Sequence, residues 1–325
     1  MRRRDFIALL GSAAALPLVA RAQPAVKPVV GFLNVASPDG YEHHVAAFRA
    51  GLKERGYVEG ENLMIEFRWA EGHYDRLPGM AADLVGREVS VIVANTPANL
   101  AAKAATSRIP IVFTTASDPV KIGLVPNLSR PGGNTTGVTQ LNVEIGPKRL
   151  ELAHELIPGA TSIAFLVNPN DALRATTVTH DAQAAAVPLG LKLHVLRAAT
   201  DAEIDAAFAG FARLKAGVLV IGVDALFNSK SQLLAELSLR YGVPAIYQYD
   251  EFADAGGLLS YGGSIKESYR WAGIYTGRIL KGERPGDLPV QQSTTVELIV
   301  NLKTAKALGI TVPMSLLGRA DKVIE

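Results

Sequence analysis

The sequence predicts an α/β fold with two parallel sheets, one after the other along the chain. Short apolar runs of β-forming residues alternate with longer segments of helical period from residue 29 onward. This alternation is typical of strands joined by crossover helices, which form parallel sheets covered by helices. The chain of 325 residues also exceeds what one hydrophobic core usually serves. We therefore expect two lobes.

The first half of the chain predicts one sheet with helices on its faces. Val45, Phe48 and Leu52 follow the first strand at helical spacing, and Gly, Pro or Asn residues bound the successive segments. Two further helices are expected over 77–85 and 100–105. The expected strands are residues 29–33, 63–69, 89–94 and 109–114.

A second series of strands begins after the turn at 131–134. One of its helices displays Ile204, Phe208 and Phe211, and a long amphipathic helix is expected over 264–282. Because a mixed strand-and-helix pattern returns at 288–308, the chain is expected to pass between the lobes more than once. The expected strands lie near 163–167, 191–196, 218–223 and 245–249.

The first 22 residues are typical of a cleaved signal peptide. Arg2-Arg3-Arg4 precedes an apolar run over 7–19, and Ala20-Arg21-Ala22 has small residues where a signal peptidase cuts. The run is shorter than the roughly 20 residues that span a bilayer. Arg3-Arg4 before Phe6-Ile7 matches the twin-arginine pattern, although the general export route accepts the same start. We expect cleavage after Ala22 and a periplasmic protein without a direct membrane anchor.

Charge and cysteine content exclude several functions. Removal of residues 1–22 takes away four arginines and one aspartate, so the formal net charge falls from +2 to −1. A nearly neutral chain without basic runs gives no support to nucleic-acid binding. The sequence has no cysteine, which excludes disulfides, thiolate metal sites, a cysteine nucleophile and a lipidated cysteine anchor.

Hydroxyl and amide side chains follow the expected strands. Because parallel strands bind ligands beyond their carboxyl ends, two such lobes form a cleft there. Each Ser or Thr is either a ligand contact or an ordinary helix cap, and each aspartate either receives a ligand ammonium or caps a helix. Tyrosines near the second sheet either face the cleft or pack in the core. These residues are Ser37, Asn95, Thr96, Thr114, Thr115, Asp118, Asn168, Asp224, Tyr247, Tyr249 and Tyr261.

Catalytic and metal motifs are missing from the sequence. The stretch 130–134 lacks the Lys-Ser/Thr of a phosphate-binding loop, and neither a G-x-G-x-x-G nor a G-x-S-x-G motif occurs at the required places. The six histidines show no metal-ligand spacing, so we interpret them as surface or packing residues. No cofactor, metal or catalytic residue is expected.

Several long strings together resemble the exported substrate-binding proteins of ABC transporters, in the family that includes tryptophan-binding members. They run in order over nearly the whole mature chain. The strings are Phe48-Arg49-Ala50-Gly51-Leu52, Gly56-Tyr57-Val58-Glu59-Gly60-Glu61-Asn62, Glu66-Phe67-Arg68-Trp69-Ala70-Glu71-Gly72, Ile109-Pro110-Ile111-Val112-Phe113, Asp118-Pro119-Val120, Leu128-Ser129-Arg130-Pro131-Gly132-Gly133-Asn134, Lys148-Arg149-Leu150-Glu151-Leu152, Pro244-Ala245-Ile246-Tyr247, Ala255-Gly256-Gly257-Leu258 and residues 301–309.

The resemblance implies the type I periplasmic-binding-protein fold, with two Rossmann-like lobes joined by a three-segment hinge. It assigns 27–141 plus 264–286 to the N-terminal lobe and 142–263 plus 287–325 to the C-terminal lobe. It also implies a closing cleft that binds a small ligand. The residues carried over are Ala36, Ser37, Asn95, Thr96, Thr115 and Asp118 on one lobe and Asn168, Asp224, Tyr247 and Tyr261 on the other.

The expected function is therefore that of a periplasmic solute-binding protein, a monomer that captures an amino acid or a small aromatic or carboxylic acid. It would deliver this ligand to an ABC permease in the inner membrane. Two alternatives remain at this stage: a receptor of the same fold that signals to a membrane sensor, and an exported α/β enzyme with Asp118 or Asp224 as base.

Overall fold

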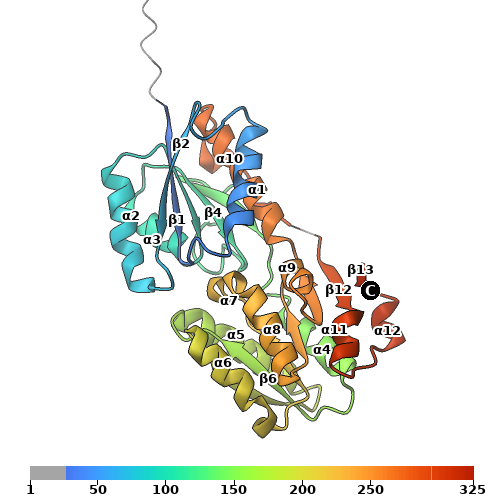
Figure 1. The fold of residues 1–325 in the computed structure, drawn as a ribbon. Helices are drawn as coiled ribbons and strands as arrows, with labels where there is room; N and C mark the ends of the chain where they lie inside the picture. The colour runs from blue at the N-terminus through green and yellow to red at the C-terminus, as the bar shows by residue number, and fades with distance from the viewer. Residues whose placement is uncertain (1–26, 294) are drawn as a thin grey trace, which may run out of the picture.

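The computed structural model describes residues 27–293 and 295–325 (Figure 1). The expected signal peptide over 1–22 lies outside the described residues. The described chain forms two α/β lobes, each built around one sheet. The strand orders are β11-β5-β4-β3-β1-β2 and β13-β12-β10-β9-β8-β6-β7, and β10–β12 is the antiparallel pair among otherwise parallel neighbours. This confirms the predicted fold class.

The first sheet is buried at its centre, because helices cover both of its faces. Every residue of the central strands β3 and β4 is buried, whereas the edge strand β2 is largely half-exposed. The strands are β1 Val29–Asn34, β2 Met64–Trp69, β3 Val91–Asn95, β4 Ile111–Thr115, β5 Thr135–Thr139 and β11 Gln291–Gln292. The helical segments are α1 Glu42–Lys53, η1 Tyr74–Arg76, α2 Leu77–Gly86, α3 Ala98–Ala105, α10 Ile265–Leu280 and η3 Pro285–Asp287.

Helix α10 packs against α1, although it follows the second series of strands in the sequence (Figure 1). Two glycines allow this contact. A Cβ atom on Gly51 would lie 1.9 Å from the carbonyl oxygen of Arg270, and one on Gly273 would lie 2.1 Å from that of Phe48. The two helix backbones therefore touch directly, which fixes α10 on the first lobe.

The second sheet has the same layered construction. Its strands are β6 Ser162–Val167, β7 Lys192–Arg197, β8 Val218–Ile221, β9 Ala245–Tyr247, β10 Leu259–Gly262, β12 Glu297–Asn301 and β13 Lys322–Ile324. Its helical segments are α4 Gly146–Leu156, α5 Ala172–Ala186, α6 Asp201–Gly210, η2 Phe211–Leu214, α7 Ala225–Ser229, α8 Ser231–Tyr241, α9 Asp250–Asp254, α11 Leu302–Ala307 and α12 Met314–Leu317. The apolar residues Ile204, Phe208 and Phe211 are buried, as their spacing predicts.

The chain passes between the sheets three times: before α4, before α10 and before β12. The last passage falls later than the expected boundary at 286/287. Gln291 and Gln292 pair with Val138 and Thr139 of β5, and the Ser293 amide donates to the Thr139 carbonyl at 2.8 Å. Backbone pairing thus holds the segment to 293 on the first sheet. The boundaries at 141/142 and 263/264 stay predictions.

Candidate ligand-binding cleft

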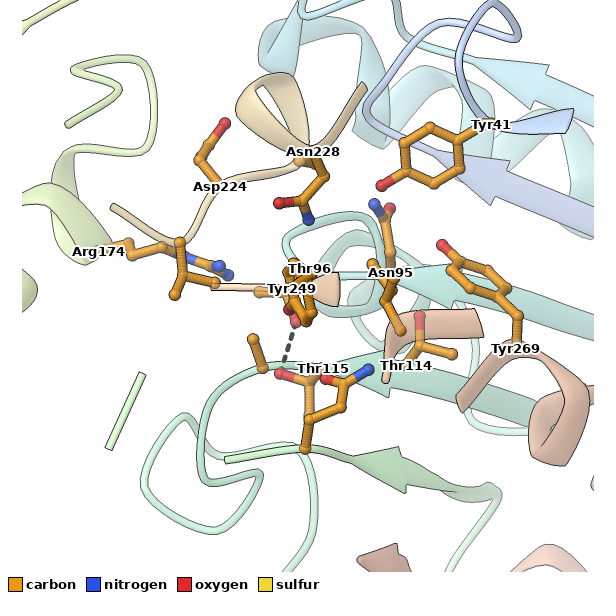
Figure 2. Close-up of a pocket in the computed structure, with 15 residues that line it drawn as sticks. Tyr41, Asn95, Thr96, Thr114, Thr115, Arg174, Asp224, Asn228, Tyr249 and Tyr269 are labelled. Carbon is orange, nitrogen blue, oxygen red and sulfur yellow. Dashed lines mark hydrogen bonds between the residues drawn. The ribbon is translucent and has the colours of Figure 1, made fainter. Parts of the chain in front are cut away.

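A pocket with about 350 Å³ of empty space lies between the lobes, at the carboxyl ends of β3 and β4 (Figure 2). Asn95 and Thr115 end these two strands, so the parallel sheet itself brings their side chains to the pocket. The second lobe faces them with Arg174 from α5 and Asp224 before α7. Both lobes therefore contribute polar side chains to one pocket.

Buried amides hold the first-lobe wall in place. The Asn95 side-chain NH₂ donates to Asn34 Oδ1 at 3.0 Å, and Asn34 Nδ2 donates to the Tyr269 hydroxyl at 3.1 Å. The Val35 backbone amide completes this hydrogen-bond network by donating to Asn95 Oδ1 at 3.2 Å. Because each member is buried and bonded to the next, this network positions Tyr269 of α10 against the strand ends of the first sheet.

Hydroxyl groups line the floor of the pocket. Thr96 Oγ1 donates to Thr115 Oγ1 at 2.9 Å and accepts a hydrogen bond from Asn99 Nδ2 at 2.8 Å. Thr96 precedes α3, yet no side chain caps that helix. The cap interpretation is therefore wrong for Thr96, whose hydroxyl bonds to its neighbour strand instead.

Asp224 is the buried carboxylate of the pocket, with 4% of its surface exposed. Its Oδ1 accepts from the Leu226 amide at 2.9 Å, which caps α7, and from Asn168 Nδ2 at 2.9 Å. Burial raises the pKa of Asp224, while the nearby Arg174 charge and these hydrogen bonds oppose the rise. The aspartate thus both caps a helix and faces the pocket, so the two interpretations of Asp224 hold together.

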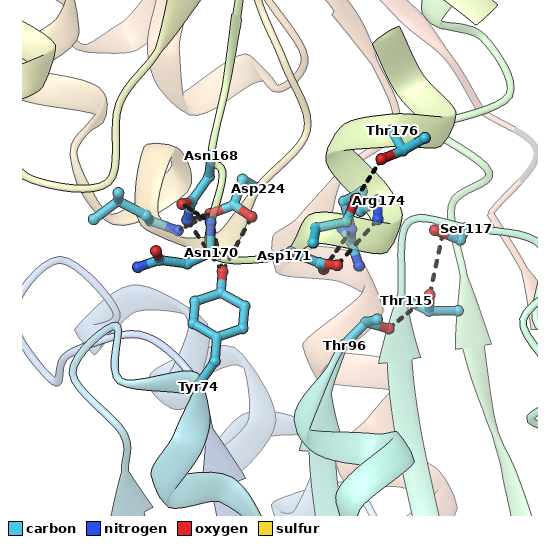
Figure 3. A network of polar contacts seen from close by, with 12 residues as sticks. Tyr74, Thr96, Thr115, Ser117, Asn168, Asn170, Asp171, Arg174, Thr176 and Asp224 are labelled. Atoms are coloured by element: carbon cyan, nitrogen blue, oxygen red, sulfur yellow. Dashed lines mark hydrogen bonds and ion pairs between the residues drawn. The ribbon is translucent and has the colours of Figure 1, made fainter. Parts of the chain in front are cut away.

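Tyr74 of the first lobe joins this carboxylate across the cleft (Figure 3). Its hydroxyl donates to Asp224 Oδ2 at 3.1 Å and accepts from Asn168 Nδ2 at 3.2 Å. Burial, followed by the Asp224 charge, raises the pKa of Tyr74, which keeps the phenol protonated as a donor. A first-lobe donor therefore meets a second-lobe acceptor in a partly buried contact.

Arg174 brings the positive charge to the pocket. It lies in the first turn of α5, and its Nε pairs with Asp171 Oδ2 at 3.1 Å. Both side chains are about one-eighth exposed, at 12% and 13%. Because Asp171 also accepts from the Arg174 amide, the aspartate fixes both the helix start and the direction of the guanidinium.

Three buried tyrosines and one amide complete the lining. Tyr41, Tyr249 and Tyr269 are each 1% exposed, and burial raises the pKa values of Tyr249 and Tyr269 to about 12. Gln140 Oε1 is buried and has no hydrogen-bond partner among the described residues. A buried acceptor without a partner is costly, so Gln140 is suited to a donor group on a ligand.

The structure brings four of the ten expected site residues to this pocket: Asn95, Thr96, Thr115 and Asp224. A fifth, Asn168, stands behind Asp224 and orients it. These five lie at or just after the carboxyl ends of β3, β4, β6 and β8, which meet at the cleft. The rule that ligands bind beyond the strand ends therefore located the pocket.

The other five expected residues lie elsewhere. Ala36 and Ser37 line a second interlobe pocket of about 560 Å³ together with Tyr74. Asp118 accepts the Val120 amide at 2.8 Å and so closes its own turn. Tyr247 is fully buried, stacked on Phe252.

Tyr261, the last of these five, is half-buried and packs against the core of the second lobe. It contributes its backbone carbonyl, which accepts from Arg149 Nη1 at 3.1 Å. The structure thus does not bring Asp118, Tyr247 or Tyr261 to the pocket, because local capping or core packing uses them.

Sequence reasoning missed several lining residues. Tyr41, directly before α1, and Tyr269, in α10, belong to the first lobe, and Arg174 and Asn228 come from the second. The sequence left open whether Tyr247 and Tyr249 face the cleft or pack in the core. Because β9 ends at Tyr247, Tyr249 lies beyond the strand and lines the pocket.

A two-lobed α/β fold with a polar, tyrosine-lined pocket at the junction defines a class of small-molecule binding proteins. The family model described as ABC transporter substrate binding protein matches residues 29–324. The chain therefore belongs to this family, as its sequence strings predicted. Within the described residues, no helix has both the length and the apolar character needed to cross a membrane.

Relatives that bind aromatic amino acids resemble the chain over most of its length. A tyrosine-binding protein of Clostridioides difficile (strain R20291) is 29% identical over 283 residues, which cover 86% of this chain and 80% of the relative. The structure of an ABC domain from Streptococcus pneumonia in complex with L-Trp is 26% identical, with a TM-score of 0.79 and coverage of 92% of this chain and 100% of that chain.

A third comparison concerns a ligand-free, open structure of a substrate-binding protein with adhesive properties from Clostridium difficile. It is 27% identical, has a TM-score of 0.61, and covers 91% of this chain and 99% of that chain.

Proposed function

We propose that this substrate-binding protein captures an aromatic α-amino acid between its lobes and delivers it, chemically unchanged, to an ABC permease. The observation that carries the proposal is that charged and aromatic side chains lie on opposite sides of the pocket. Arg174 and Asp224 lie on one side, and Tyr41 and Tyr269 lie on the other (Figure 2). A zwitterion with an aromatic side chain has the same two ends.

The ammonium group of the ligand is assigned to Asp224. A carboxylate offers about four acceptor positions, and Leu226, Asn168 and Tyr74 take three of them. The remaining position lies on Oδ2, which accepts from Tyr74 alone at a good distance. A charge-assisted hydrogen bond at this buried site is worth about 1.5–3 kcal/mol.

The carboxylate of the ligand is assigned to Arg174, with the Thr96 and Thr115 hydroxyls beside it. The ion pair with Asp171 uses Nε, and the two Nη groups have further donor capacity. The uncapped start of α3, directly after Thr96, adds partial positive charge at the same place. These features support a carboxylate at the junction of α3 and α5.

The aromatic side chain of the ligand is assigned to the wall formed by Tyr41 and Tyr269. The rings of these two tyrosines meet edge to face, with centroids 6.1 Å apart. Such a wall offers both an apolar face and hydroxyl groups to a flat ligand.

The described chain has the features of the closed form. Its backbone is more similar to the L-Trp complex than to the open relative, with TM-scores of 0.79 and 0.61, although the identities are nearly equal at 26% and 27%. The contact of Tyr74 with Asp224 across the cleft supports the same conclusion. The proposal also includes export of the protein into the periplasm by the segment 1–22 and release of the ligand to a permease. It keeps the predicted lobe boundaries at 141/142 and 263/264.

Calorimetric titration of the ligand-depleted mature protein tests the assignment of each group. L-Tryptophan is compared with tryptamine, which lacks the carboxylate, and with indole-3-propionate, which lacks the ammonium. We expect the wild type to prefer L-tryptophan at least tenfold over either analogue. Asp224→Asn should remove the preference over indole-3-propionate, and Arg174→Met the preference over tryptamine.

An exposed ion pair on the second lobe provides matched controls. Asp205 and Arg240 lie 3.6 Å apart and are 44% and 60% exposed. Asp205→Asn and Arg240→Met should leave every affinity unchanged. The proposal fails if neither L-tryptophan nor L-tyrosine binds more tightly than L-alanine, or if mass spectrometry finds the incubated amino acid chemically altered.

A further inference from the structure

A cluster of two histidines and one glutamate lies between the lobes, outside the ligand pocket. His43 and His44 belong to the first turn of α1, whose start faces the second lobe, and Glu251 belongs to α9 (Figure 1). Glu251 Oε1 lies 2.8 Å from His44 Nε2 and 3.3 Å from His43 Nε2. The three potential ligand atoms all lie within 4.8 Å of one another.

One oxygen of this carboxylate faces both imidazoles, while the other has no partner. Glu251 Oε2 and His44 Nδ1 are buried without a hydrogen-bond partner among the described residues. His44 has no exposed side-chain surface, and Glu251 is 14% exposed. A buried carboxylate oxygen without a partner is costly, and a cation held by the three side chains would interact favourably with this carboxylate.

We propose that His43, His44 and Glu251 form a binding site for a divalent transition-metal ion, zinc above all, that is complete only when the lobes are closed. Two imidazole nitrogens and one carboxylate oxygen are a common zinc-ligand set, and they leave one coordination position for water. The nitrogen and oxygen donors also favour Zn²⁺ over Mg²⁺ or Ca²⁺, which prefer oxygen ligands.

Metal binding at this cluster competes with protonation, because the hydrogen bond to Glu251 raises the pKa of His43. Burial opposes the charge of Glu251, but the hydrogen bonds from His43 and His44 lower its pKa to about 2, so it is a carboxylate. Burial lowers the pKa of His44, which keeps its imidazole neutral. A neutral imidazole and an ionised carboxylate are the forms that ligate metals.

The cluster also contacts the wall of the ligand pocket. The His44 ring lies 4.7 Å from the ring of Tyr41 and 5.3 Å from that of Tyr269, measured between centroids. Both tyrosines line the pocket. Because the cation needs Glu251 from the second lobe, it binds the closed form selectively and shifts the lobes toward closure. It should therefore slow the release of any ligand, whatever that ligand is.

Titration with zinc chloride alone tests the site on untagged mature protein that has been treated with EDTA. We expect binding of one zinc ion per chain in the wild type. Affinity should fall at least tenfold in Glu251→Gln, which keeps the side-chain shape, and in His43→Ala, whose position is 42% exposed and tolerant of substitution. His180→Ala, at an exposed position on α5, is the matched control and should bind zinc as the wild type does.

Small-angle X-ray scattering supplies the conformational test. Zinc chloride without ligand should reduce the radius of gyration of the wild type and leave that of Glu251→Gln unchanged. Two results would overturn the proposal. One is equal zinc binding by the wild type and Glu251→Gln. The other is that the wild type binds no zinc and Glu251→Gln differs from it only by lower stability. The second result would make the cluster a hydrogen-bonded contact alone. Both outcomes are separate from the amino-acid titrations.

Discussion

The Tyr74 hydroxyl donates a hydrogen bond to Asp224 Oδ2 at 3.1 Å, and these two residues belong to opposite lobes. Tyr74 comes from the short η1 helix before α2, and Asp224 caps α7. This contact between the lobes involves the same carboxylate that we assign to the ligand ammonium. Closure and ligand recognition therefore depend on the same side chain.

Tyr74→Phe should weaken amino-acid binding about tenfold. The substitution removes a hydrogen bond to a charged acceptor, worth about 1.5 kcal/mol or more, from the closed form and not from the open form. Isothermal titration with L-tryptophan measures the effect. Tyr241→Phe is the matched control, because the Tyr241 hydroxyl donates to the Asp205 carboxylate at 3.1 Å on the exposed surface of one lobe. An equal loss in both variants would contradict a role of Tyr74 in closure.

Affinity for an amino acid should fall as the pH is lowered through the acidic range. The ligand ammonium needs Asp224 ionised, and burial raises the pKa of this carboxyl above its usual value of 3.8. As the pH is lowered, protonation of Asp224 therefore begins to weaken ligand binding at a higher pH than it would for an exposed aspartate. The logarithm of the affinity should fall by up to about one per pH unit below that pKa. Titrations between pH 7 and 4 measure this slope, which Asp224→Asn should abolish.

Gly40→Ala should hold the lobes apart. Gly40 has a φ of +82°, and a Cβ atom there would lie 2.5 Å from the carbonyl oxygen of Ser229 on the other lobe. A backbone oxygen cannot move aside as a flexible side chain can, so the methyl group should keep the lobes from closing fully. We expect a larger radius of gyration with ligand present and at least tenfold weaker binding. Gly56→Ala is the control, because Gly56 has a φ of +86° but nothing within 4 Å. Similar losses in both variants would assign the effect to backbone strain alone.

Gly273→Ala should destabilise the first lobe by about 1–3 kcal/mol, because the new methyl group overpacks the contact between α1 and α10. The Cβ would lie 2.1 Å from the Phe48 carbonyl oxygen. Urea unfolding measures the change. In Gly79→Ala, on α2 with nothing within 4 Å, stability should stay equal or rise by up to about 1 kcal/mol. Unchanged stability in Gly273→Ala would contradict the direct helix contact.

The fold was predictable because its signals are local. Alternation of apolar runs with helical periods is present in each segment of 10 to 20 residues, and parallel sheets follow from it. Short elements were the exception. The strand β11 has two residues, Gln291 and Gln292, with no apolar pattern, and their pairing with β5 depends on partners 153 residues earlier in the chain. The expected boundary at 287 therefore missed it.

The candidate site was predictable where it coincides with strand ends. Asn95 and Thr115 end β3 and β4, and Asp224 follows β8 closely. Asp118 follows β4 in the same way, yet its carboxylate caps its own turn. No local feature distinguishes these two aspartates, because the difference lies in which of them the opposite lobe approaches.

The sequence by itself determined the α/β class, the existence of two lobes and the family, because hydrophobic periodicity and the family's long sequence segments can be read without knowing any contact. Only the tertiary structure decided which side chains share a site. Tyr269 reaches the pocket because α10 returns to the first lobe, and Tyr74 reaches Asp224 because the lobes meet. His44 and Glu251 are 207 residues apart and are joined by a 2.8 Å contact. Contacts of this kind form between distant segments, so no spacing in the sequence records them.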